Sequence, residues 1–422
     1  MDPMGLPDWL ALLESRHAKI IQLGLERVGQ VWDALGVGPQ MPVITVAGTN
    51  GKGSTCAYLE AILAKAGYRV GLYSSPHILR FNERIRIAGR EADDAAIVSA
   101  LDAVERARGE VALTYFEHTT LAAMWLFSQE RVEVAVLEVG LGGRLDAVNL
   151  FDADCAVVTP VDLDHMEYLG PDREAIGFEK AGIFRAGRPA VCVDPEPPAS
   201  LIRHAERLGV TLLRLGVDIH VERHGGDWLC RIDDAVFPNL PKPAMTGSYQ
   251  YDNAAATIAA LHCLNERLPV TLAAIRSGLA RARLPGRFQV VGQAPLRILD
   301  VAHNPHAARA LADNLAALPR TGRRLAVVAM LADKDAGAVV DALAGQFDHW
   351  HLAGLGGARG RSAAQLADVF GARGLSVSLH DGVESAWRAA CQEAGPADTI
   401  TAFGSFHTVA EIMALTAGKF DG

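Results

Sequence analysis

The sequence predicts an α/β protein of two domains, each built around a mostly parallel β-sheet. Length is the first indication, because 422 residues exceed the roughly 100 to 200 that one domain usually holds. Composition is the second, since 50% hydrophobic and 21% charged residues supply enough apolar mass for a folded core. The third is an alternation of short apolar runs with segments of helical period, which is typical of βαβ units.

Four short apolar runs in the first half of the chain are expected to be buried strands of a largely parallel sheet. They are Val43–Ala47, Val70–Tyr73, Val134–Val139 and Ala156–Thr159. Helical patterns at Ala57–Ala66 and Thr119–Gln129 lie between most of them. The stretch Leu212–Phe237 differs, because histidines and glycines are mixed there with short alternating runs. We expect an antiparallel excursion over that stretch.

A domain boundary is expected at Leu284–Phe288, where a Pro-Gly pair breaks any helix. The two helical patterns before it are Asn253–Leu268 and Leu272–Ala282. Beyond it, strands are expected at Leu296–Val301, Leu325–Met330, His349–Ala353, Ser376–Leu379 and Thr399–Phe403, with helices such as Ala307–Ala317, Ala338–Phe347 and Val383–Glu393. The sequence therefore predicts a larger domain over residues 1–287 and a smaller Rossmann-like α/β domain over residues 288–422.

Charge and cysteine content exclude several classes of function. A net charge of −9 offers no global attraction for nucleic acid, so a phosphate partner must be held locally. The longest uncharged run, Ala34–Gly51, contains two prolines and four glycines and cannot be one membrane-spanning helix. No basic segment precedes an apolar run at the N-terminus, so a cytoplasmic protein is expected. The six cysteines lie at least 33 residues apart, which favours reduced thiols over a CxxC site.

The strongest motif is a glycine-rich loop between a β-branched strand and a helix that opens near Lys52. It reads Gly48-Thr49-Asn50-Gly51-Lys52-Gly53-Ser54. The glycines allow successive backbone N–H groups to point inward, and the helix N-terminus adds partial positive charge, so an anion cradle is predicted. Lys52 would reach the β- and γ-phosphates of a nucleotide. Because Val46 stands at the first glycine position and the hydroxyl falls on Ser54, this is a variant P-loop, and the larger domain is of P-loop ATPase type.

This loop resembles that of the Mur ligase superfamily, and particularly of the folylpolyglutamate synthases. Further segments resemble blocks of that family in the same order, namely Ser74–His77, Thr114–Glu117, Leu137–Ala147, Leu163–His165, Glu179–Gly182, Leu284–Phe288, Asp300–Pro305 and Gly404–Val409. The resemblance runs from about Leu23 to Ala410 and is strongest to the bifunctional bacterial enzymes. It implies a ligase that uses ATP to join L-glutamate to dihydropteroate, making dihydrofolate, and adds further glutamates to reduced folates.

Such a reaction passes through an acyl phosphate, so the site must stabilise phosphoryl charge, a role suited to Mg²⁺. Glu138 lies near the end of an expected strand, where parallel sheets place ligand-binding groups. The resemblance implies that Ser75, Glu138 and His165 hold Mg²⁺. From the residues alone, Asp162 and Asp164 rank above His165, because hard cations prefer oxygen ligands. A monovalent cation is a further candidate cofactor.

The resemblance implies three catalytic residues, Lys52, Lys180 and His303. The lysine that matches Lys180 is carbamylated in the family, and CO₂ adds only to a neutral amine, so the site would have to lower the pKa of Lys180. Without the resemblance, Lys180 would be a solvated cation. His303 follows an expected strand and would bind the incoming glutamate or the acyl phosphate, or would instead cap the helix after it.

The remaining site residues are also implied by the resemblance. The loop residues Thr49 to Ser54, together with Asn253, Arg287 and Asp300, would bind ATP in a cleft gated by a hinge near Arg287. Ser405 and His407 are candidates for glutamate binding. The pterin would be bound by Thr114, Tyr115, Phe116, Glu117, Leu145, Asp146 and Ala147. An aromatic pair beside a carboxylate suits a flat heterocycle, although Tyr115 and Phe116 at helical spacing are often core residues.

Several alternatives stay open at this point. A monofunctional folylpolyglutamate synthase would lack the dihydropteroate reaction. A non-folate Mur-type ligase of the peptidoglycan kind would be expected to carry a UDP-binding domain before its P-loop, for which the start of this loop at Gly48 leaves no room. A nucleotide-gated switch would hydrolyse ATP without a small-molecule acceptor, and the pterin-like segments argue against it. A monomer without nucleic-acid or membrane partners is expected.

Overall fold

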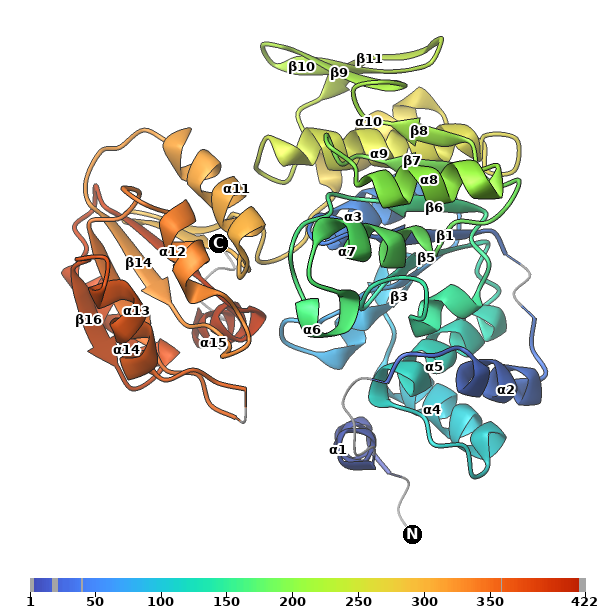
Figure 1. Ribbon diagram of the computed structural model, residues 1–422, viewed down its shortest axis with the longest axis horizontal. Coiled ribbons are helices and arrows are strands. Elements are labelled where there is room, and N and C mark those ends of the chain that lie inside the picture. Colours follow the sequence, from blue (N-terminus) through green and yellow to red (C-terminus); the bar gives the residue numbers. More distant parts are fainter. Residues whose placement is uncertain (1–3, 17–21, 39–40, 358, 417–422) are drawn as a thin grey trace. The chain divides into compact units, whose positions relative to one another are not determined.

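The chain folds as two α/β units in a computed structural model that describes residues 4–16, 22–38, 41–357 and 359–416. The units divide between Arg283 and Leu284, and Met245–Tyr249 groups with the second unit. The first contains an eight-stranded sheet and a three-stranded sheet, and the second contains a six-stranded sheet (Figure 1). The predicted fold class, two units with mostly parallel sheets, is confirmed.

The large sheet of the first unit has the spatial order β4-β3-β2-β5-β1-β6-β7-β8. Its strands are β1 (Val43–Ala47), β2 (Val70–Tyr73), β3 (Ile85–Ile87), β4 (Arg90–Glu91), β5 (Val134–Glu138), β6 (Cys155–Val158), β7 (Ala190–Cys192) and β8 (Leu212–Arg214). From β2 to β8 the strands pair in parallel, whereas β3 and β4 form an antiparallel edge. All of β1 is buried, because an apolar run suits a strand covered on both faces. The four strands expected here are confirmed within one residue at each end.

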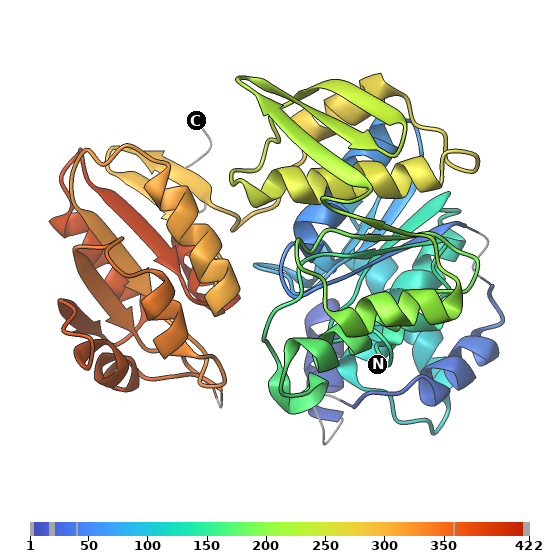
Figure 2. The same ribbon diagram turned by 45° about the horizontal axis from the view of Figure 1, so that its top comes forward.

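Helices surround this sheet, and Figures 1 and 2 show their arrangement. They are α1 (Leu6–Arg16), α2 (Glu26–Leu35), α3 (Lys52–Lys65), α4 (Asp94–Arg108), α5 (Tyr115–Gln129), α6 (Met166–Leu169), α7 (Arg173–Ala181), α8 (Ala199–Leu208), α9 (Tyr249–Cys263) and α10 (Leu272–Arg281), with 3₁₀ turns at Phe81–Arg84 and Ala147–Leu150. Helix α3 packs closely on α10, and α7 on α8. These packings position the start of α3, where Lys52 lies, and the last turn of α7, where Lys180 lies.

The antiparallel excursion is confirmed in part. A separate sheet of order β11-β10-β9 is formed by β9 (Ile219–His224), β10 (Asp227–Ile232) and β11 (Ala235–Pro241) (Figure 2). The expectation was wrong for Leu212–Arg214, which forms β8. That strand pairs in parallel with β7 and buries Leu213, so its apolar residues complete the large sheet instead.

The sheet of the second unit has the order β12-β13-β17-β14-β15-β16, and β12 is its one antiparallel strand among the described residues. Its strands are β12 (Gln289–Gln293), β13 (Leu296–Leu299), β14 (Arg324–Val328), β15 (His349–Ala353), β16 (Val377–His380) and β17 (Thr399–Phe403). Its helices are α11 (Pro305–Ala316), α12 (Ala336–Ala342), α13 (Ala363–Gly371), α14 (Val383–Glu393) and α15 (Phe406–Thr416). The core lies between the sheet and these helices.

The expected helix Ala338–Phe347 was wrong at both ends. Helix α12 begins earlier, because the side chain of Asp335 accepts a hydrogen bond from the backbone N–H of Ala338 at 2.9 Å and caps the helix. It ends at Ala342, and Gly345 then adopts a φ of +74°, which suits a turn rather than a helix.

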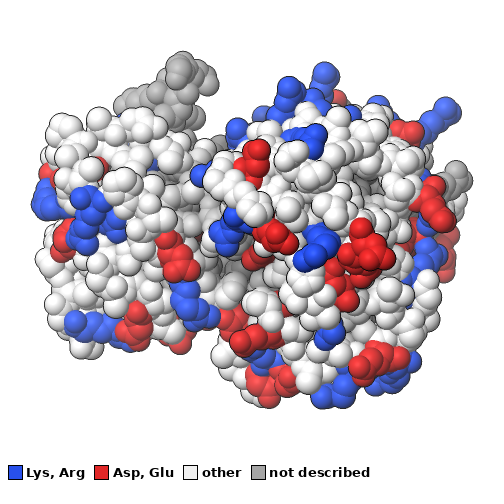
Figure 3. Space-filling view, turned by 90° about the horizontal axis from the view of Figure 1, so that it is seen from above, with Lys and Arg blue, Asp and Glu red and all other residues white. Residues whose placement is uncertain are grey.

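Lys and Arg side chains are interspersed with Asp and Glu on the face shown in Figure 3. Within the described ranges, each helix is too short or too polar to cross a bilayer.

Candidate active site

The glycine-rich loop joins the buried strand β1 to helix α3, which begins at Lys52, as the motif predicts. Gly48 and Gly51 have φ values of +146° and +97°. A Cβ atom on Gly48 would lie 1.8 Å from Oγ1 of Thr159, and one on Gly51 would lie 2.6 Å from Oδ1 of Asn253. Both positions therefore require glycine for conformation and for space. The backbone of this loop therefore has the turned conformation that anion-binding loops require.

Lys52 lies folded back over this loop. Its Nζ donates to the backbone carbonyls of Gly48 and Thr49, each at 3.1 Å. The loop is tied to the segment after β6, since Thr49 N–H donates to the carbonyl of Pro160 at 2.8 Å and Thr49 Oγ1 donates to the carbonyl of Asp162 at 2.9 Å. The ammonium group is thus held at the mouth of the cradle, where it can reach a phosphate.

Asn253 reaches the loop from helix α9, through a buried chain of amides. Asn253 Nδ2 donates to Gln250 Oε1 at 3.2 Å, and Gln250 Nε2 donates to Oγ of Ser54 at 3.3 Å. The structure therefore brings Asn253 together with the predicted loop residues Gly51 and Ser54. Sequence reasoning missed Gln250, which lies one helical turn before Asn253 and holds the Ser54 hydroxyl.

Lys180, on helix α7, is buried against the same loop. Its side chain is 4% exposed, and its Nζ donates to the carbonyl of Gly48 at 2.9 Å. Burial, and secondly the charge of Lys52, lower the pKa of Lys180 to about 7, while Asp164 and Asp146 act in the opposite direction. The interpretation of Lys180 as a solvated cation is therefore wrong. At neutral pH this amine divides between its charged and neutral forms.

Helix α7 is held by close backbone contact with the segment Gly143–Arg144. A Cβ on Gly143 would lie 2.7 Å from the carbonyl oxygen of Glu179, so only glycine allows this approach. The adjacent Arg144 donates its N–H to that same carbonyl at 2.8 Å, and its guanidinium pairs with the Glu179 carboxylate at 2.8 Å. The Gly-Gly-Arg segment thus fixes the residue that precedes Lys180.

Two of the three candidate magnesium ligands lie together at the carboxyl ends of adjacent strands. Glu138 ends β5 and is 5% exposed, and Ser75 follows β2. Ser75 N–H donates to Glu138 Oε2 at 3.3 Å. A hydroxyl and a carboxylate supply the oxygen ligands that Mg²⁺ prefers. His165 stands at the start of α6 with a φ of +52°, and its Nε2 is 3.9 Å from Oδ1 of Asp164.

The two segments expected to bind the pterin come together around Gly140. A Cβ on Gly140 would lie 2.7 Å from Cζ of Phe116, so the ring packs directly on the backbone. The buried carboxylate of Asp146 accepts the N–H groups of Leu141 at 2.8 Å and Val148 at 3.0 Å. Burial raises the pKa of Asp146 to about 6. An aromatic face and a carboxylate are therefore adjacent, with Leu145 and Ala147 flanking the acid.

Thr114 and Glu117 also begin helix α5, as a reciprocal cap. Thr114 N–H donates to Glu117 Oε2 at 2.8 Å, and Glu117 N–H donates to Thr114 Oγ1 at 3.3 Å. Arg27 pairs with the other oxygen of Glu117 at 2.5 Å. The T-x-x-E spacing could have predicted the cap. Nothing in the sequence indicated the Arg27 pair, 90 residues away. The half-buried Tyr115 ring lies 5.6 Å from the Arg84 guanidinium.

In the second unit, Asp300 follows strand β13 and both of its oxygens are engaged. Oδ2 accepts the N–H of Phe288 at 2.8 Å, and Oδ1 accepts the N–H of Ala302 at 2.7 Å. Burial raises the pKa of Asp300, which is 7% exposed. The guanidinium of Arg287 stacks on the ring of Phe406, 5.3 Å from its centroid. These contacts join the start of the unit to its strand ends.

The other candidates of the second unit lie at two strand-to-helix turns. His303 Nδ1 donates to the backbone carbonyl of residue 301 at 2.8 Å. Asn304, not His303, caps helix α11, because its Oδ1 accepts the N–H of residue 307 at 2.9 Å, so the alternative role for His303 was wrong. Ser405 is buried and accepts the N–H of the exposed His407 at 3.1 Å. Ser405 thereby caps helix α15.

Comparison with known proteins places this geometry among ligases. Residues 46–261 match the Mur ligase middle domain and residues 286–406 match the Mur ligase glutamate ligase domain. A dihydrofolate synthase/folylpolyglutamate synthase of Escherichia coli K12 is 48% identical over 418 residues, which cover 99% of this chain and 97% of that protein.

Two solved structures are similar along nearly their whole length. One is Escherichia coli FolC in complex with DHPP and ADP, with a TM-score of 0.94 and 47% identity over 99% of this chain and 98% of the other. The second is a bifunctional folylpolyglutamate synthase/dihydrofolate synthase with Mn, AMPPNP and L-glutamate bound, with a TM-score of 0.92 and 47% identity over 98% of both chains.

Proposed function

The chain belongs to the Mur ligase family, and we propose that it is a bifunctional dihydrofolate synthase/folylpolyglutamate synthase. It joins L-glutamate to dihydropteroate at the expense of ATP and adds further glutamates to reduced folates. The full-length relatives that bear this name support the assignment. The observation that carries it is the pair of lysines, Lys52 and Lys180, that share the carbonyl of Gly48 at the phosphate loop.

ATP is assigned to the loop and to the groups that support it. The proposed nucleotide-binding residues are Thr49, Asn50, Gly51, Lys52, Gly53, Ser54, Asn253, Arg287 and Asp300. The loop amides and Lys52 would bind the phosphates, and Lys52 would stabilise the charge that develops during phosphoryl transfer. The positive φ values of Gly48 and Gly51 support this role, because such a backbone turn is typical of loops that bind anions.

Ser75, Glu138 and His165 are the proposed ligands of Mg²⁺. The adjacency of the Ser75 backbone to the buried Glu138 carboxylate fits a hard cation. When bound, the ion supplies charge neutralisation for the phosphate oxygens. Mn and AMPPNP are bound in one of the similar structures, which supports a divalent metal beside a nucleotide. We also propose that a monovalent cation binds.

We propose that Lys180 is carbamylated. The neutral amine nitrogen would attack the carbon of CO₂, form an N–C bond and release one proton to solvent, leaving a carbamate anion. The pKa of about 7 supports this step, because a large share of the amine is then neutral at pH 7. The product replaces the repulsion between Lys52 and Lys180 by an attraction.

The substrate carboxylate would take the γ-phosphoryl group of ATP, and the glutamate amine would then displace phosphate from the acyl phosphate. For the pterin we propose Thr114–Glu117 and Leu145–Ala147. Phe116 offers a ring face and Asp146 a carboxylate beside it. For glutamate or the acyl phosphate we propose His303, Ser405 and His407. We further propose that the chain acts in the cytoplasm as a monomer.

Turnover of the purified full chain tests this function. The chain is incubated with Mg-ATP and L-glutamate, with either dihydropteroate or tetrahydrofolate as acceptor, and products are identified by mass. Each acceptor should support ADP formation that depends on glutamate and should gain the mass of glutamyl residues. Activity with tetrahydrofolate alone would favour a monofunctional folylpolyglutamate synthase. ADP formation without any acceptor would favour the nucleotide switch, and turnover with neither acceptor would contradict the proposal.

A further inference from the structure

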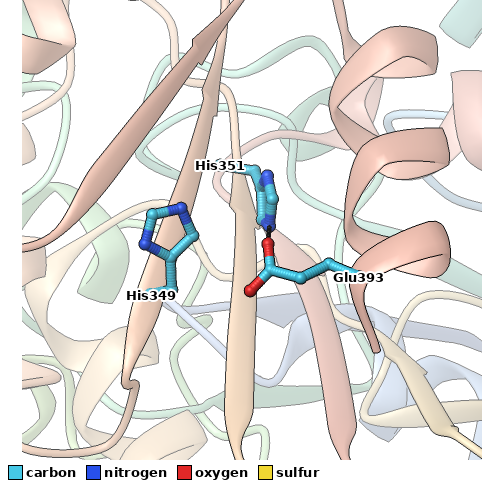
Figure 4. A group of neighbouring side chains, drawn as sticks. All are labelled: His349, His351 and Glu393. Atoms are coloured by element: carbon cyan, nitrogen blue, oxygen red, sulfur yellow. Dashed lines mark ion pairs between the residues drawn. The ribbon is translucent and has the colours of Figure 1, made fainter. Parts of the chain in front are cut away.

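A group of three metal-ligating side chains lies in the second unit, on strand β15 and helix α14. His349 and His351 are two residues apart on β15, so their side chains are on the same face of the sheet. Glu393 is the last residue of α14 (Figure 4). One ligand atom from each of the three lies within 4.8 Å of the others.

His351 has a buried nitrogen whose hydrogen-bonding capacity is not satisfied. The residue is 2% exposed, and its Nδ1 lies 3.0 Å from Nε2 of His380. Its Nε2 lies 3.3 Å from Oε2 of Glu393, without the geometry of a well-formed hydrogen bond. Buried polar atoms are nearly always paired, so this nitrogen calls for a partner. In the tautomer whose Nδ1 donates to His380, the lone pair of Nε2 faces a carboxylate, an arrangement that a cation would stabilise.

The other two side chains are already held in position. Arg323 donates to Oε1 of Glu393 at 2.7 Å, which leaves Oε2 directed at His351. The ring nitrogens of His349 lie 2.8 Å from Oγ of Ser376 and 2.9 Å from Oγ of Ser378. A metal would replace one of these serine contacts, and the other would fix the ring as the outer partners of metal ligands do.

We propose that His349, His351 and Glu393 form a Zn²⁺-binding site. Two imidazoles and one carboxylate, with water in the fourth position, are an established ligand set for zinc. The two nitrogen ligands disfavour Mg²⁺ and Ca²⁺, which prefer oxygen. Tetrahedral zinc ligands are about 3.3 Å apart. Nε2 of His351 and Oε2 of Glu393 already have this separation, so the half-buried His349 ring must approach them by up to roughly 1.5 Å.

The position of this site separates it from the proposed chemistry. His349 begins β15, whereas Asp300 and Ser405 follow the carboxyl ends of β13 and β17 in the same parallel sheet. The zinc site therefore lies toward the amino ends of these parallel strands, whereas the groups to which catalysis is assigned lie at their carboxyl ends. A bound ion would join β15 to α14 and stabilise the second unit without entering the reaction.

Zinc binding by the full chain tests the proposal. A tag-free protein is stripped with EDTA and titrated with Zn²⁺ in millimolar Mg²⁺, and bound zinc per chain and thermal unfolding are measured. The variants are His349→Ala and Glu393→Gln. The matched control is His224→Ala, an exposed histidine 3.8 Å from Glu222 in the three-stranded sheet. The wild type and the control should bind one more zinc than either variant, or bind it at least tenfold more tightly, and zinc should raise the unfolding temperature of these two proteins more than that of either variant.

The difference between proteins is decisive because His165, in the candidate magnesium site, offers zinc a second place to bind. The amount of zinc bound at His165 would be the same in the wild type, the control and both variants, so it would cancel when their stoichiometries are compared. Equal stoichiometry and affinity in the wild type, His349→Ala and Glu393→Gln would overturn the proposal. So would a wild-type unfolding temperature that zinc leaves unchanged.

Discussion

The first and second units differ in how they hold their candidate polar groups. In the first, the side-chain nitrogens of Lys52 and Lys180 both donate to the carbonyl of Gly48, at 3.1 Å and 2.9 Å, so two basic groups share one acceptor. In the second, the oxygens of Asp300 and Ser405 accept backbone N–H groups at strand ends. The first arrangement places two basic groups against each other, whereas in the second each oxygen has a backbone donor.

This difference separates two ways in which a buried polar residue contributes. A group held against its electrostatic preference changes its pKa and gains reactivity, which is common at catalytic sites. A group that satisfies backbone donors fixes a turn, and its loss costs stability first. Substitutions in the first unit should therefore reduce turnover in a folded protein. Substitutions in the second should reduce the free energy of unfolding as well.

The largest effect is expected for Lys52→Ala. Its charge is needed mainly when phosphoryl charge develops, so turnover should fall by about 10² to 10³-fold while the fold stays intact. Glutamate-dependent ADP formation measures the loss, and circular dichroism checks the fold. Lys65→Ala, an exposed lysine at the other end of α3, is the control and should keep wild-type turnover. Near-normal turnover of Lys52→Ala would remove the lysine from the phosphate site.

Lys180→Ala should also lose most activity, and the nature of its rescue identifies the lost group. If a carbamate is present, removing it leaves a space that acetate can enter, and acetate should restore part of the turnover. If Lys180 instead contacts phosphate as a cation, small amines should rescue the variant and carboxylates should not. The intact-protein mass of the wild type in bicarbonate provides an independent check for added CO₂.

The pH dependence of this carbamylation follows from the lowered pKa of Lys180. An amine of pKa about 7 is roughly 10% neutral at pH 6 and 90% neutral at pH 8. The rate at which a given concentration of CO₂ activates enzyme that has been freed of CO₂ should therefore be about ninefold higher at pH 8. Between pH 7 and 10.5 the unfolded chain binds more protons here than the folded chain. The contribution of Lys180 to folding stability therefore rises with pH across that window. Activation that is equal at both pH values would contradict a titrating amine.

A smaller effect is expected for Asp146→Asn, which keeps the size of the side chain but removes its charge. If the carboxylate accepts hydrogen bonds from pterin nitrogens, KM for dihydropteroate should rise several-fold with little change in KM for ATP. Because burial raises the pKa of Asp146 to about 6, the wild-type KM should rise as pH falls below 6, and that rise should be absent in the variant. Identical pH profiles for the two proteins would exclude Asp146 from this role.

The sequence predicted those parts of the molecule that depend on local pattern. The apolar run Val43–Ala47 and the loop glycines fixed strand β1, the turn and the start of α3, because burial and positive φ leave few alternatives. The fold class was predicted for the same reason. Leu212–Arg214 was misassigned because a three-residue strand at a sheet edge has too little pattern to reveal its partner.

Contacts between segments far apart in the chain could not be predicted from the sequence. The pKa of Lys180 depends on Lys52, which is 128 residues earlier, and on burial that arises only when α7 meets the loop. The Arg27–Glu117 pair and the His349, His351 and Glu393 group are likewise made by packing. Alternate histidines on β15 were visible in the sequence, but their partner at the end of α14 was not.

The smallest effect is expected for Ser405→Ala, and it tests the second half of the comparison. Ser405 caps α15 through the N–H of His407, so its loss should lower the free energy of unfolding by about 1 kcal/mol. His407→Ala keeps that backbone N–H and is exposed, so it should leave stability within about 0.5 kcal/mol of the wild type. If both side chains also bind glutamate, KM for glutamate should rise a few-fold in both variants, although only Ser405→Ala unfolds more easily. Urea unfolding and glutamate titration separate these effects. A Ser405→Ala protein with unchanged stability would show that the second unit, like the first, holds its polar groups for chemistry rather than for its turns.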